Sequence, residues 1–431
     1  MSTRQNLCYL DIRPKLVPAD CDSVIEIRPR FDGGRFPAGR EFTLSHVMME
    51  DTRVAENAPV AWEKLVRVDE DGVLRVRSFF EGEQEHVIRG ITFENSYGAT
   101  PVEARLYSLR DDLYLRKAWK GDLHLHSCRS DGLEPPPYVA ASSRRIGLDF
   151  MAVTDHRRYA PSLEAIAAFA DVEHDLRIFP GEELHPNVVH IVNFGGSFGV
   201  DELLERKKSI REIASIRKVL PPMPPGVNPA WAAQMHWAFN KVREAGGLAI
   251  FCHPYWVYGQ HYSLAEAYID YIFATQPFDA LELIGGFMLH ETESNLLQVA
   301  RYHEERARGH ILPIVGSSDS HGCERGDLFG WYYTIVFSPV TELSELIATI
   351  KEGYSVAIDA MPGADARAHG SFRLVKYAHF LLREIFPLHD ELCTEEGYLM
   401  HRHLRGDPNA GAALARLSGR VARLYAQLWG W

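Results

Sequence analysis

Apolar and polar residues alternate along the first part of the chain. The segments 23–28 (SVIEIR) and 74–77 (LRVR) place apolar side chains at every second position. A period of two is typical of a strand with one buried face. Short strands of this kind, separated by Gly, Pro and Asp turns, predict a small all-β, sandwich-like domain over residues 1–118. Further strands are expected at 86–93, 104–109 and 113–116.

From residue 119 to residue 358 the pattern changes to apolar strands that alternate with helical stretches. This order is typical of an α/β domain with parallel strands, and the block is close to the ~250 residues of a barrel of alternating strands and helices. Expected strands are 150–154, 176–180, 188–194, 248–252, 280–284, 312–315 and 331–337. Expected helices are 138–146, 230–245 and those that begin near 162, at a capping box over Ser263–Glu266 and near 341.

The segment 359–431 is predicted to be a helical C-terminal extension. Its apolar residues recur at a spacing of three and four, which is typical of one buried helix face. We expect this face to pack on the barrel rather than to form a coiled coil with a partner. The residues of this face are Leu414, Leu417, Val421, Leu424 and Leu428.

Charge and cysteine content narrow the function. The chain has 46 Lys and Arg against 58 Asp and Glu, a net charge of −12. Such a balance argues against long-range capture of a nucleic acid polymer, so a small molecule is the expected partner. The N-terminus lacks the apolar core of a signal peptide, no apolar run could span a bilayer, and no Cys-x-x-Cys pair occurs. A cytoplasmic protein without a membrane partner is therefore expected, and the sequence leaves open whether it forms a homo-oligomer.

The stretch 121–132 (GDLHLHSCRSDG) holds the first candidate metal ligands. On a strand, His124 and His126 leave the same face because one residue separates them. Asp131 follows in a polar turn. A His-x-His strand that runs into a carboxylate-bearing turn is a common beginning of a metal site in hydrolases.

Further candidate ligands recur at the ends of the expected strands. In an α/β barrel these ends lie on one rim, where catalytic groups gather, so residues distant in sequence should converge in space. Because His, Asp and Glu are rarely buried unpaired, their recurrence in register predicts a metal centre. The residues concerned are Asp155, His156, Glu182, Glu183, His185, His190, His253, Asp319 and His321.

These motifs resemble the PHP (polymerase and histidinol phosphatase) family of metal-dependent phosphoesterases. The chain carries His-x-His with Ser-Asp-Gly downstream, Thr-Asp-His, Gly-x-Glu, a lone His in an apolar strand, His-Pro and Gly-Ser-x-Asp-x-His, in family order. The Gly-Asp-Leu-His opening after a β module is similar to the carbaryl hydrolase-like branch. The resemblance covers residues 119–358 and implies a distorted (β/α)7 barrel, with two or three divalent metal ions (zinc, manganese or iron) at its C-terminal rim.

The resemblance also implies which side chains hold the ions. Glu183 would bridge two ions, which together can lower the pKa of a trapped water toward ~7 and present hydroxide to phosphorus. Glu183, Asp319 and His321 are the expected catalytic residues. The three implied ligand groups are His124, His126, Glu183 and Asp319; Asp131, His156 and Glu183; and His190, His253 and His321.

Two ligand choices need the family pattern. Glu182 and Glu183 point to opposite sides of a strand, so only one of them should face the metals, and the Gly-x-Glu match favours Glu183. His185 competes with His190, which the apolar strand context and the family pattern favour.

Residues beside the ligand motifs are candidates for supporting roles. Asp155 and Glu282 are expected to orient ligand side chains, and Cys128 and Cys252 are interpreted as buried thiols. Loop residues after the motifs are candidates for gripping a substrate phosphate or stacking on a base. These loop residues are Arg129, Arg157, Tyr255, Trp256 and His261.

The expected activity is hydrolysis of small phosphate mono- or diesters, such as nucleotide or sugar phosphates. The alternative is a carbamate, ester or amide hydrolase, because the same metal-activated hydroxide could attack a carbonyl. A non-catalytic module on the same fold would lack ligands, and none is missing. An amidohydrolase barrel also begins with His-x-His, but it usually needs a bridging lysine that no expected strand end offers here.

Overall fold

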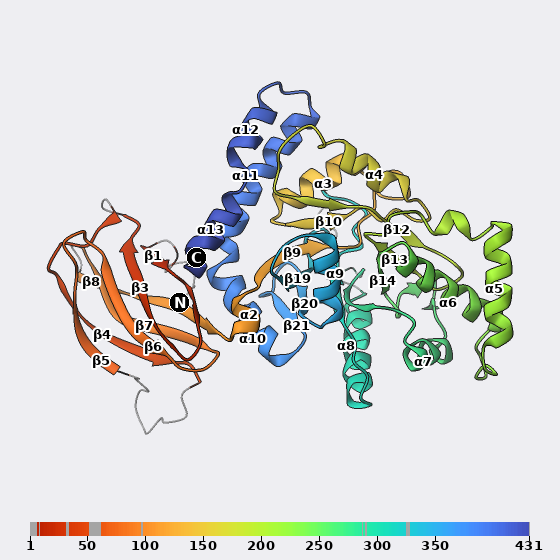
Figure 1. Ribbon diagram of the computed structural model, residues 1–431, viewed down its shortest axis with the longest axis horizontal. Helices are drawn as coiled ribbons and strands as arrows, with labels where there is room; N and C mark the ends of the chain where they lie inside the picture. The colour runs from red at the N-terminus through yellow and green to blue at the C-terminus, as the bar shows by residue number, and fades with distance from the viewer. Residues whose placement is uncertain are drawn as a thin grey trace. The chain divides into compact units, whose positions relative to one another are not determined.

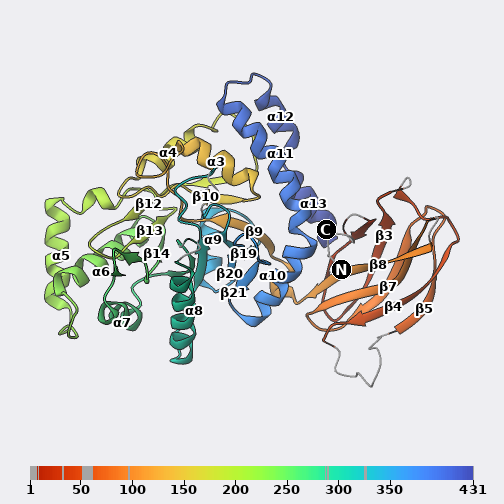
Figure 2. The same ribbon diagram turned by 180° about the vertical axis from the view of Figure 1, so that it is seen from behind.

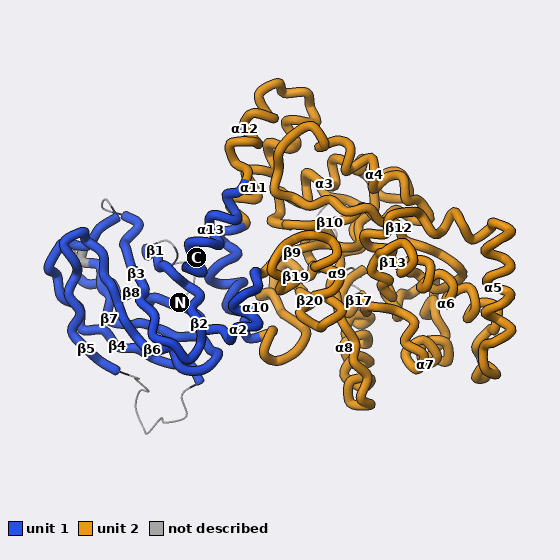
Figure 3. Tube along the Cα trace, viewed as in Figure 1, with its two compact units in different colours: residues 1–117, 376–389, 419–431 blue, residues 118–375, 390–418 orange. Residues whose placement is uncertain are grey.

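The chain forms two compact units, each built from segments distant in sequence (Figure 3). The computed structural model describes residues 7, 9–31, 34–50, 62–95, 98–286, 288, 291–324 and 328–430. The first unit, here the sandwich unit, comprises residues 1–117, 376–389 and 419–431. The second, here the α/β unit, comprises residues 118–375 and 390–418. The segment that follows residue 358 thus contributes to both units.

The sandwich unit contains two antiparallel-rich sheets that enclose one apolar core. One sheet has the order β1 (Leu10–Arg13), β3 (Cys21–Pro29), β6 (Leu74–Phe80). The other has the order β2 (Leu16–Pro18), β8 (Gly98–Leu109), β7 (Glu85–Asn95), β4 (Glu41–Met48), β5 (Trp62–Arg67). Ile25 and Ile27 are fully buried in this core, as the period of two predicts. The strand predicted at 113–116 is wrong, because Asp111 and Asp112 begin a short helix, α2 (Asp111–Tyr114).

The end of the chain completes the sandwich unit. Lys15 and Glu384 form a buried ion pair with 2.5 Å between Nζ and Oε2, and Glu384 is the last residue of α10 (Phe372–Glu384). The backbone of Lys15 also donates to the carbonyl of Leu428, in α13 (Arg420–Trp429). Residues from both ends of the chain therefore share this unit.

The α/β unit is mixed, with two larger sheets and surrounding helices (Figures 1 and 2). One sheet has the order β11 (Arg177–Phe179), β10 (Phe150–Ala152), β9 (Lys117–Asp122), β19 (Tyr332–Ser338), β20 (Ser355–Asp359), β21 (Arg367–His369). The other has the order β12 (Gly181–Leu184), β13 (Ile191–Phe194), β14 (Leu248–Phe251), β17 (Ala280–Gly285), β18 (Ile314–Ser317). A two-stranded hairpin joins β15 (Val257–Tyr258) to β16 (His261–Tyr262).

Only part of these sheets is parallel, which differs from the expectation of an all-parallel domain. Strands β9, β10 and β11 are parallel, as are β14, β17 and β18. Strand β13 runs antiparallel to both β12 and β14, and β20 runs antiparallel to β19 and β21. The link between β12 and β13 has only six residues, 185–190, which is too short for the crossover that parallel strands need.

Two isolated bridges connect strand ends of one sheet with those of the other. Leu125 pairs with Ser320, and His156 pairs with Glu183, both in parallel orientation. Around the first bridge, the Asp319 amide donates to the His124 carbonyl over 2.9 Å. These backbone contacts place the candidate ligand segments side by side.

Helices flank the strands of the α/β unit, with α3 beside α4 and α5 beside α6. The sequence predicts most of them, but the capping box is wrong: α7 begins at Glu266, because the Ser263 amide bonds to the Trp256 carbonyl. No helix of the described ranges is both long and apolar enough to cross a bilayer. The helices are α3 (Pro136–Arg145), α4 (Ala160–Ala167), α5 (Lys207–Val219), α6 (Pro229–Glu244), α7 (Glu266–Thr275), α8 (Thr292–Ala307), α9 (Leu343–Lys351), α11 (Phe386–Leu404) and α12 (Ala410–Leu417).

Arg144 ties the C-terminal helices to the α/β unit. Its guanidinium is fully buried, 2.7 Å from a carboxylate oxygen of Glu396 in α11 and 3.1 Å from one of Asp149 before β10. A buried charge is tolerated when it is paired and hydrogen-bonded, and Arg144 also donates to the Leu148 carbonyl. Residues 390–404 are therefore part of this unit's interior rather than a separate appendage.

A buried chain of hydrogen bonds in the sandwich unit requires two neutral histidines. The Ser108 hydroxyl donates to the Gly82 carbonyl, so His86 Nε2–H donates to Ser108 Oγ over 2.7 Å. His46 Nε2–H then donates to His86 Nδ1 over 3.0 Å, and His46 Nδ1 accepts from the Ser78 hydroxyl. Burial lowers the pKa of His46 to about 4 and that of His86 to about 3.

The hydrogen bonds of His46 and His86 predict that the sandwich unit is sensitive to acid. Below pH ~6.5 the unfolded histidines take up protons that the folded ones refuse, so stability falls as the pH drops from ~6.5 toward ~4, by up to ~1.4 kcal/mol per pH unit for each histidine. Thermal unfolding of the full chain, followed by circular dichroism between pH 7 and pH 4.5, should show a smaller loss in His46→Gln. The control His303→Ala removes an exposed histidine of α8 and should behave as wild type. Equal pH dependence in all three proteins would contradict the prediction.

Candidate metal centre

The carboxylate of Glu183 is fully buried among histidines. Its Oε2 atom lies 2.6 Å from His156 Nδ1 and 3.4 Å from both His124 Nε2 and His126 Nε2. These imidazoles come from segments that follow β9 and β10, whereas Glu183 lies within β12. The bridge between His156 and Glu183 and the bridge of Leu125 hold these segments together.

The second oxygen of Glu183 faces a different set of imidazoles. Its Oε1 atom lies 2.8 Å from His190 Nδ1, 3.3 Å from His253 Nε2 and 3.6 Å from His185 Nε2. His185 and His190 bound the short link between β12 and β13, and His253 follows β14. Among the described residues, one carboxylate thus meets six imidazoles, three on each oxygen, as a bridging ligand would.

Asp319 completes the first predicted ligand group. Its Oδ1 atom lies 2.9 Å from His126 Nε2 and 3.2 Å from His124 Nε2. Its backbone has φ of 51°, a conformation that few residues other than glycine adopt and that often marks a functional site. The ligand atoms of His124, His126, Glu183 and Asp319 lie within 4.8 Å of one another.

Asp131 joins the histidines of the other predicted groups. Its Oδ2 atom lies 3.4 Å from His156 Nε2, and its Oδ1 atom lies 3.3 Å from His321 Nε2. The His321 ring stacks on that of His126, with centroids 4.2 Å apart. These four residues form a second compact set of ligand atoms. His321 therefore lies beside Asp131, whereas the resemblance groups it with His190 and His253.

Many atoms of this cluster approach one another without hydrogen-bond geometry. His156 Nδ1 and Glu183 Oε2 are only 2.6 Å apart, yet neither has a hydrogen-bond partner among the described residues. Buried polar atoms normally have such a partner. Because the lone pairs of these nitrogen and oxygen atoms point toward shared positions, we infer that cations would occupy those positions. Imidazole nitrogen and carboxylate oxygen together fit zinc, manganese or iron. Three other buried atoms of the cluster also have no hydrogen-bond partner among the described residues: His185 Nε2, His190 Nδ1 and Asp319 Oδ1.

The electrostatics of the cluster also favour cations. Burial opposes the charge of Glu183, but its interactions with the imidazoles of His190 and His124 outweigh burial and hold the pKa of Glu183 well below its usual range. Burial likewise opposes the charge of His124, but the carboxylates of Asp319 and Glu183 raise its pKa well above the usual value. The carboxylates thus stay ionised and attract positive charge. A bound metal ion would supply that charge.

Buried carboxylates hold the ligand segments in place. Glu282 Oε2 accepts a hydrogen bond from His124 Nδ1 over 2.9 Å, which leaves His124 Nε2 facing the cluster, and Glu282 Oε1 accepts from the His253 amide. This is the supporting role expected of Glu282. Asp122, which sequence reasoning missed, accepts from the amides of His124 and Ser318 and links two ligand segments. Its position two residues before His124 was the available signal.

The structure distinguishes Glu182 from Glu183. Glu182 points away from the cluster and accepts from Asn193 Nδ2 and the Val200 amide, and burial raises its pKa to about 7. Both competing histidines reach the cluster, since His185 Nε2 and His190 Nδ1 lie 3.6 and 2.8 Å from Glu183 Oε1 and their rings stack with centroids 3.9 Å apart. The alternation of side chains along β12 was enough to predict which glutamate faces the cluster. No such periodicity applies to the loop 185–190, so it could not decide between His185 and His190.

Asp155 supports the His-x-His loop instead of facing the cluster. Its side chain accepts from the Ser127 amide over 2.8 Å and from the Ser130 hydroxyl. Cys252 is buried as expected, but Cys128 is exposed, because it lies in the turn that follows the histidines.

Of the five predicted substrate contacts, the structure brings only Trp256 to the cluster. Arg129 is exposed, paired with Glu164 at 2.8 Å, and lines a separate cavity together with Arg157. Tyr255 is buried beside Glu266, 3.5 Å from it, and His261 is exposed at another cavity. Adjacency to a ligand motif in sequence does not fix the direction of a loop side chain.

A cavity of about 440 Å³ opens over the cluster. Three apolar residues line it beside the candidate ligands, namely Trp256, Met288 and Leu328. Trp256 was a sequence candidate, whereas nothing in the sequence pattern pointed to the other two. The candidate ligands on its wall are Asp131, His156, His185, His190, His253, Asp319 and His321.

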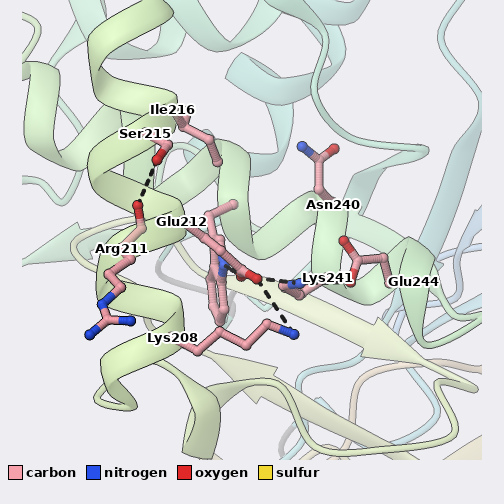
Figure 4. Close-up of a pocket in the computed structure, with 9 residues that line it drawn as sticks. Lys208, Arg211, Glu212, Ser215, Ile216, Asn240, Lys241 and Glu244 are labelled. Carbon is pink, nitrogen blue, oxygen red and sulfur yellow. Dashed lines mark hydrogen bonds and ion pairs between the residues drawn. The ribbon is translucent and has the colours of Figure 1, made fainter.

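A larger cavity of about 580 Å³ lies between α5 and α6 (Figure 4). Here Glu212 accepts from Trp237 Nε1 over 2.8 Å and pairs with Lys241 at 3.2 Å. No histidine or cysteine occurs among the described residues that line it. Four of its charged groups, Lys208, Glu212, Lys241 and Glu244, form ion pairs among themselves. The smaller cavity, which holds the candidate ligands, is the better candidate for chemistry.

A comparison with known structures finds matches of low similarity. A two-domain protein from Bacteroides vulgatus, containing a predicted PHP-like metal-dependent phosphoesterase, matches with 18% identity and a TM-score of 0.39 over 56% of this chain. The match spans 65% of that protein, less than two-thirds of its length. A candidate metal-dependent phosphoesterase from Bifidobacterium adolescentis matches with 17% identity and a TM-score of 0.32, over 62% of this chain and 96% of its own.

A third similar structure is an amidohydrolase from Chromobacterium violaceum, with 19% identity and a TM-score of 0.29 over 48% of this chain and 88% of its own. No family model and no curated protein matches the chain. The residues of the cluster therefore carry the functional argument.

Neutralising the carboxylate that orients His124 should weaken metal binding. Glu282→Gln keeps the shape of the side chain but loses its charge, and loss of such a supporting carboxylate typically lowers metal affinity about 10- to 100-fold. Titration calorimetry with Zn²⁺ and Mn²⁺ measures this. Glu212→Gln, which alters a carboxylate between α5 and α6, should bind as wild type. Unchanged affinity in Glu282→Gln would contradict the role of Glu282.

Proposed function

We propose that this chain is a metal-dependent hydrolase of small phosphate mono- or diesters, such as nucleotide or sugar phosphates. The observation that carries the proposal is the buried carboxylate of Glu183, whose two oxygens face six imidazoles. Burying such a group is unfavourable unless cations balance it. Imidazole and carboxylate ligands together are typical of metal centres in hydrolases.

The residues of the cluster would have different roles in the proposed reaction. Bound ions would act as Lewis acids and supply an activated water. Glu183 would bind with both oxygens and orient two groups of ligands. Asp319 and His321 keep 15% and 37% of their side chains exposed, so each can contact a molecule in the cavity. His321 Nδ1 donates to the Asp319 carbonyl over 2.8 Å, and His321 Nε2 lies 3.3 Å from Asp131 Oδ1, where an ion could be held.

The finer fold proposal is a distorted seven-stranded barrel. It is supported by the two isolated bridges, which extend pairing from the end of β9 to the end of β18 and from the end of β10 to β12. Together with the paired neighbours within each sheet, these contacts run once around a closed circuit. The strands of the circuit are β9, β10, β12, β13, β14, β17 and β18.

The reaction class can be tested with two chromogenic esters. With added Mn²⁺, the protein should hydrolyse p-nitrophenyl phosphate and leave p-nitrophenyl acetate largely intact, because paired metal ions stabilise the charge that develops on phosphate oxygens. Release of p-nitrophenol is followed by absorbance. Turnover of the acetate alone would support the carbamate, ester or amide hydrolase instead.

Removing a central ligand should abolish turnover without unfolding the chain. His124→Ala and Glu183→Ala each take away a buried cluster group, so kcat should fall below detection, while circular dichroism should match wild type. His303→Ala, at an exposed position of α8, should retain full activity. Normal turnover by either cluster variant would remove the site assignment.

A further inference from the structure

Trp256 is fixed at the edge of the cavity over the cluster. Its amide donates to the His253 carbonyl over 3.0 Å, and its carbonyl accepts from the Ser263 amide over 2.8 Å. The residue therefore lies at the base of the β15–β16 hairpin, three residues after the candidate ligand His253. Its ring lines the cavity and remains half-buried rather than enclosed in the core.

The ring of Trp256 links the cluster to the outer hairpin. Its centroid lies 5.5 Å from that of His190 and 6.0 Å from that of His253. On the other side it lies 5.6 Å from the ring of Tyr258, which is 66% exposed. An aromatic surface thus begins at the candidate ligands and continues outward along the hairpin.

Among the described residues, the rest of the cavity wall comprises Gly286, Glu291 and three apolar side chains. Met288 and Leu328 add apolar surface to that of Trp256. Among the described residues that line the cavity, none is Lys or Arg. Positive charge for a phosphate would therefore come from the cluster, and the part of the wall formed by Trp256, Met288 and Leu328 suits a flat, apolar group.

We propose that Trp256 sets substrate specificity by stacking on an aromatic ring in the leaving group of the ester, while the ester group lies at the cluster. This inference rests on the proposed function and names its substrate class: phosphate esters that carry a phenyl ring or a nucleobase. Offset or edge-to-face contact between aromatic rings adds affinity beyond the area buried. Because the ring stacks equally on substrate and transition state, it lowers KM more than it raises kcat.

The test compares three phosphate esters on wild type and Trp256 variants. With Mn²⁺, Trp256→Ala should raise KM about 10-fold for p-nitrophenyl phosphate and adenosine 5′-monophosphate, as expected for the loss of one stacked ring. KM for glycerol 2-phosphate and all three kcat values should change less than about 2-fold. Trp256→Phe should restore most of the loss. A defect for only one of the two aromatic esters would identify that ring type as the one Trp256 selects.

The matched control and a binding assay separate this inference from the proposed function. Trp231→Ala removes a half-exposed tryptophan of α6 at a different cavity and should behave as wild type. Titration calorimetry of the Mn²⁺-loaded protein should show that phenylphosphonate binds more tightly than methylphosphonate, and that Trp256→Ala removes the difference. Equal effects of Trp256→Ala on all three esters, or an undiminished preference for phenylphosphonate, would overturn the inference. If wild type hydrolyses none of the esters, the proposed function fails, and the phosphonate comparison still decides the role of Trp256.

Discussion

A carboxylate removed from water has to be compensated by positive charge, and this constraint organises the α/β unit. Glu183 has no exposed surface, and the groups around its oxygens are imidazoles, which act as metal ligands only in their neutral form. Protons shared among the rings can balance the charge in part, whereas divalent ions between the rings would balance it fully. The packing of the strand ends follows from this requirement, since every imidazole must reach the same buried point.

The backbone supplies that convergence. The His-x-His segment contacts the segment of Asp319 through the Leu125–Ser320 bridge, and His156 contacts β12 through its bridge to Glu183. Glu282 then accepts a hydrogen bond from the His124 ring, and Asp122 accepts from the amides of His124 and Ser318. These bonds hold the ligand segments in position. Ordered side chains of this kind reduce the reorganisation that ion binding would otherwise require.

Much of this arrangement follows from the sequence where a periodic rule applies. Strand alternation separates Glu182 from Glu183, because consecutive residues of β12 face opposite sides. Apolar runs locate strands such as β14, which is buried on both faces: Ile250 packs in one apolar cluster and Phe251 in another. Because the ligand motifs follow the expected strands, the sequence also predicted that these distant histidines and carboxylates meet at one site.

The sequence was less informative where no period exists. The strand directions of β12 and β13 depend on the length of one loop, and the substrate contacts predicted at Arg129, Tyr255 and His261 depend on loop conformation. The short helix α2 arose where an apolar alternation of four residues was too brief to specify a strand. The His185 and His190 choice stayed open for the same reason, because both ends of a tight turn can face one carboxylate.

The interleaved make-up of the two units has a consequence for biosynthesis. The sandwich unit uses residues 376–389 and 419–431, and the α/β unit uses residues 390–418. The last residues of both units therefore leave the ribosome only near the end of synthesis, so the strands of the sandwich unit are synthesised well before the helical segments that complete that unit. Cutting the chain near residue 117 would leave the first fragment without residues 376–389 and 419–431 of the sandwich unit. The second fragment would keep every segment of the α/β unit and would carry those two segments without their partners.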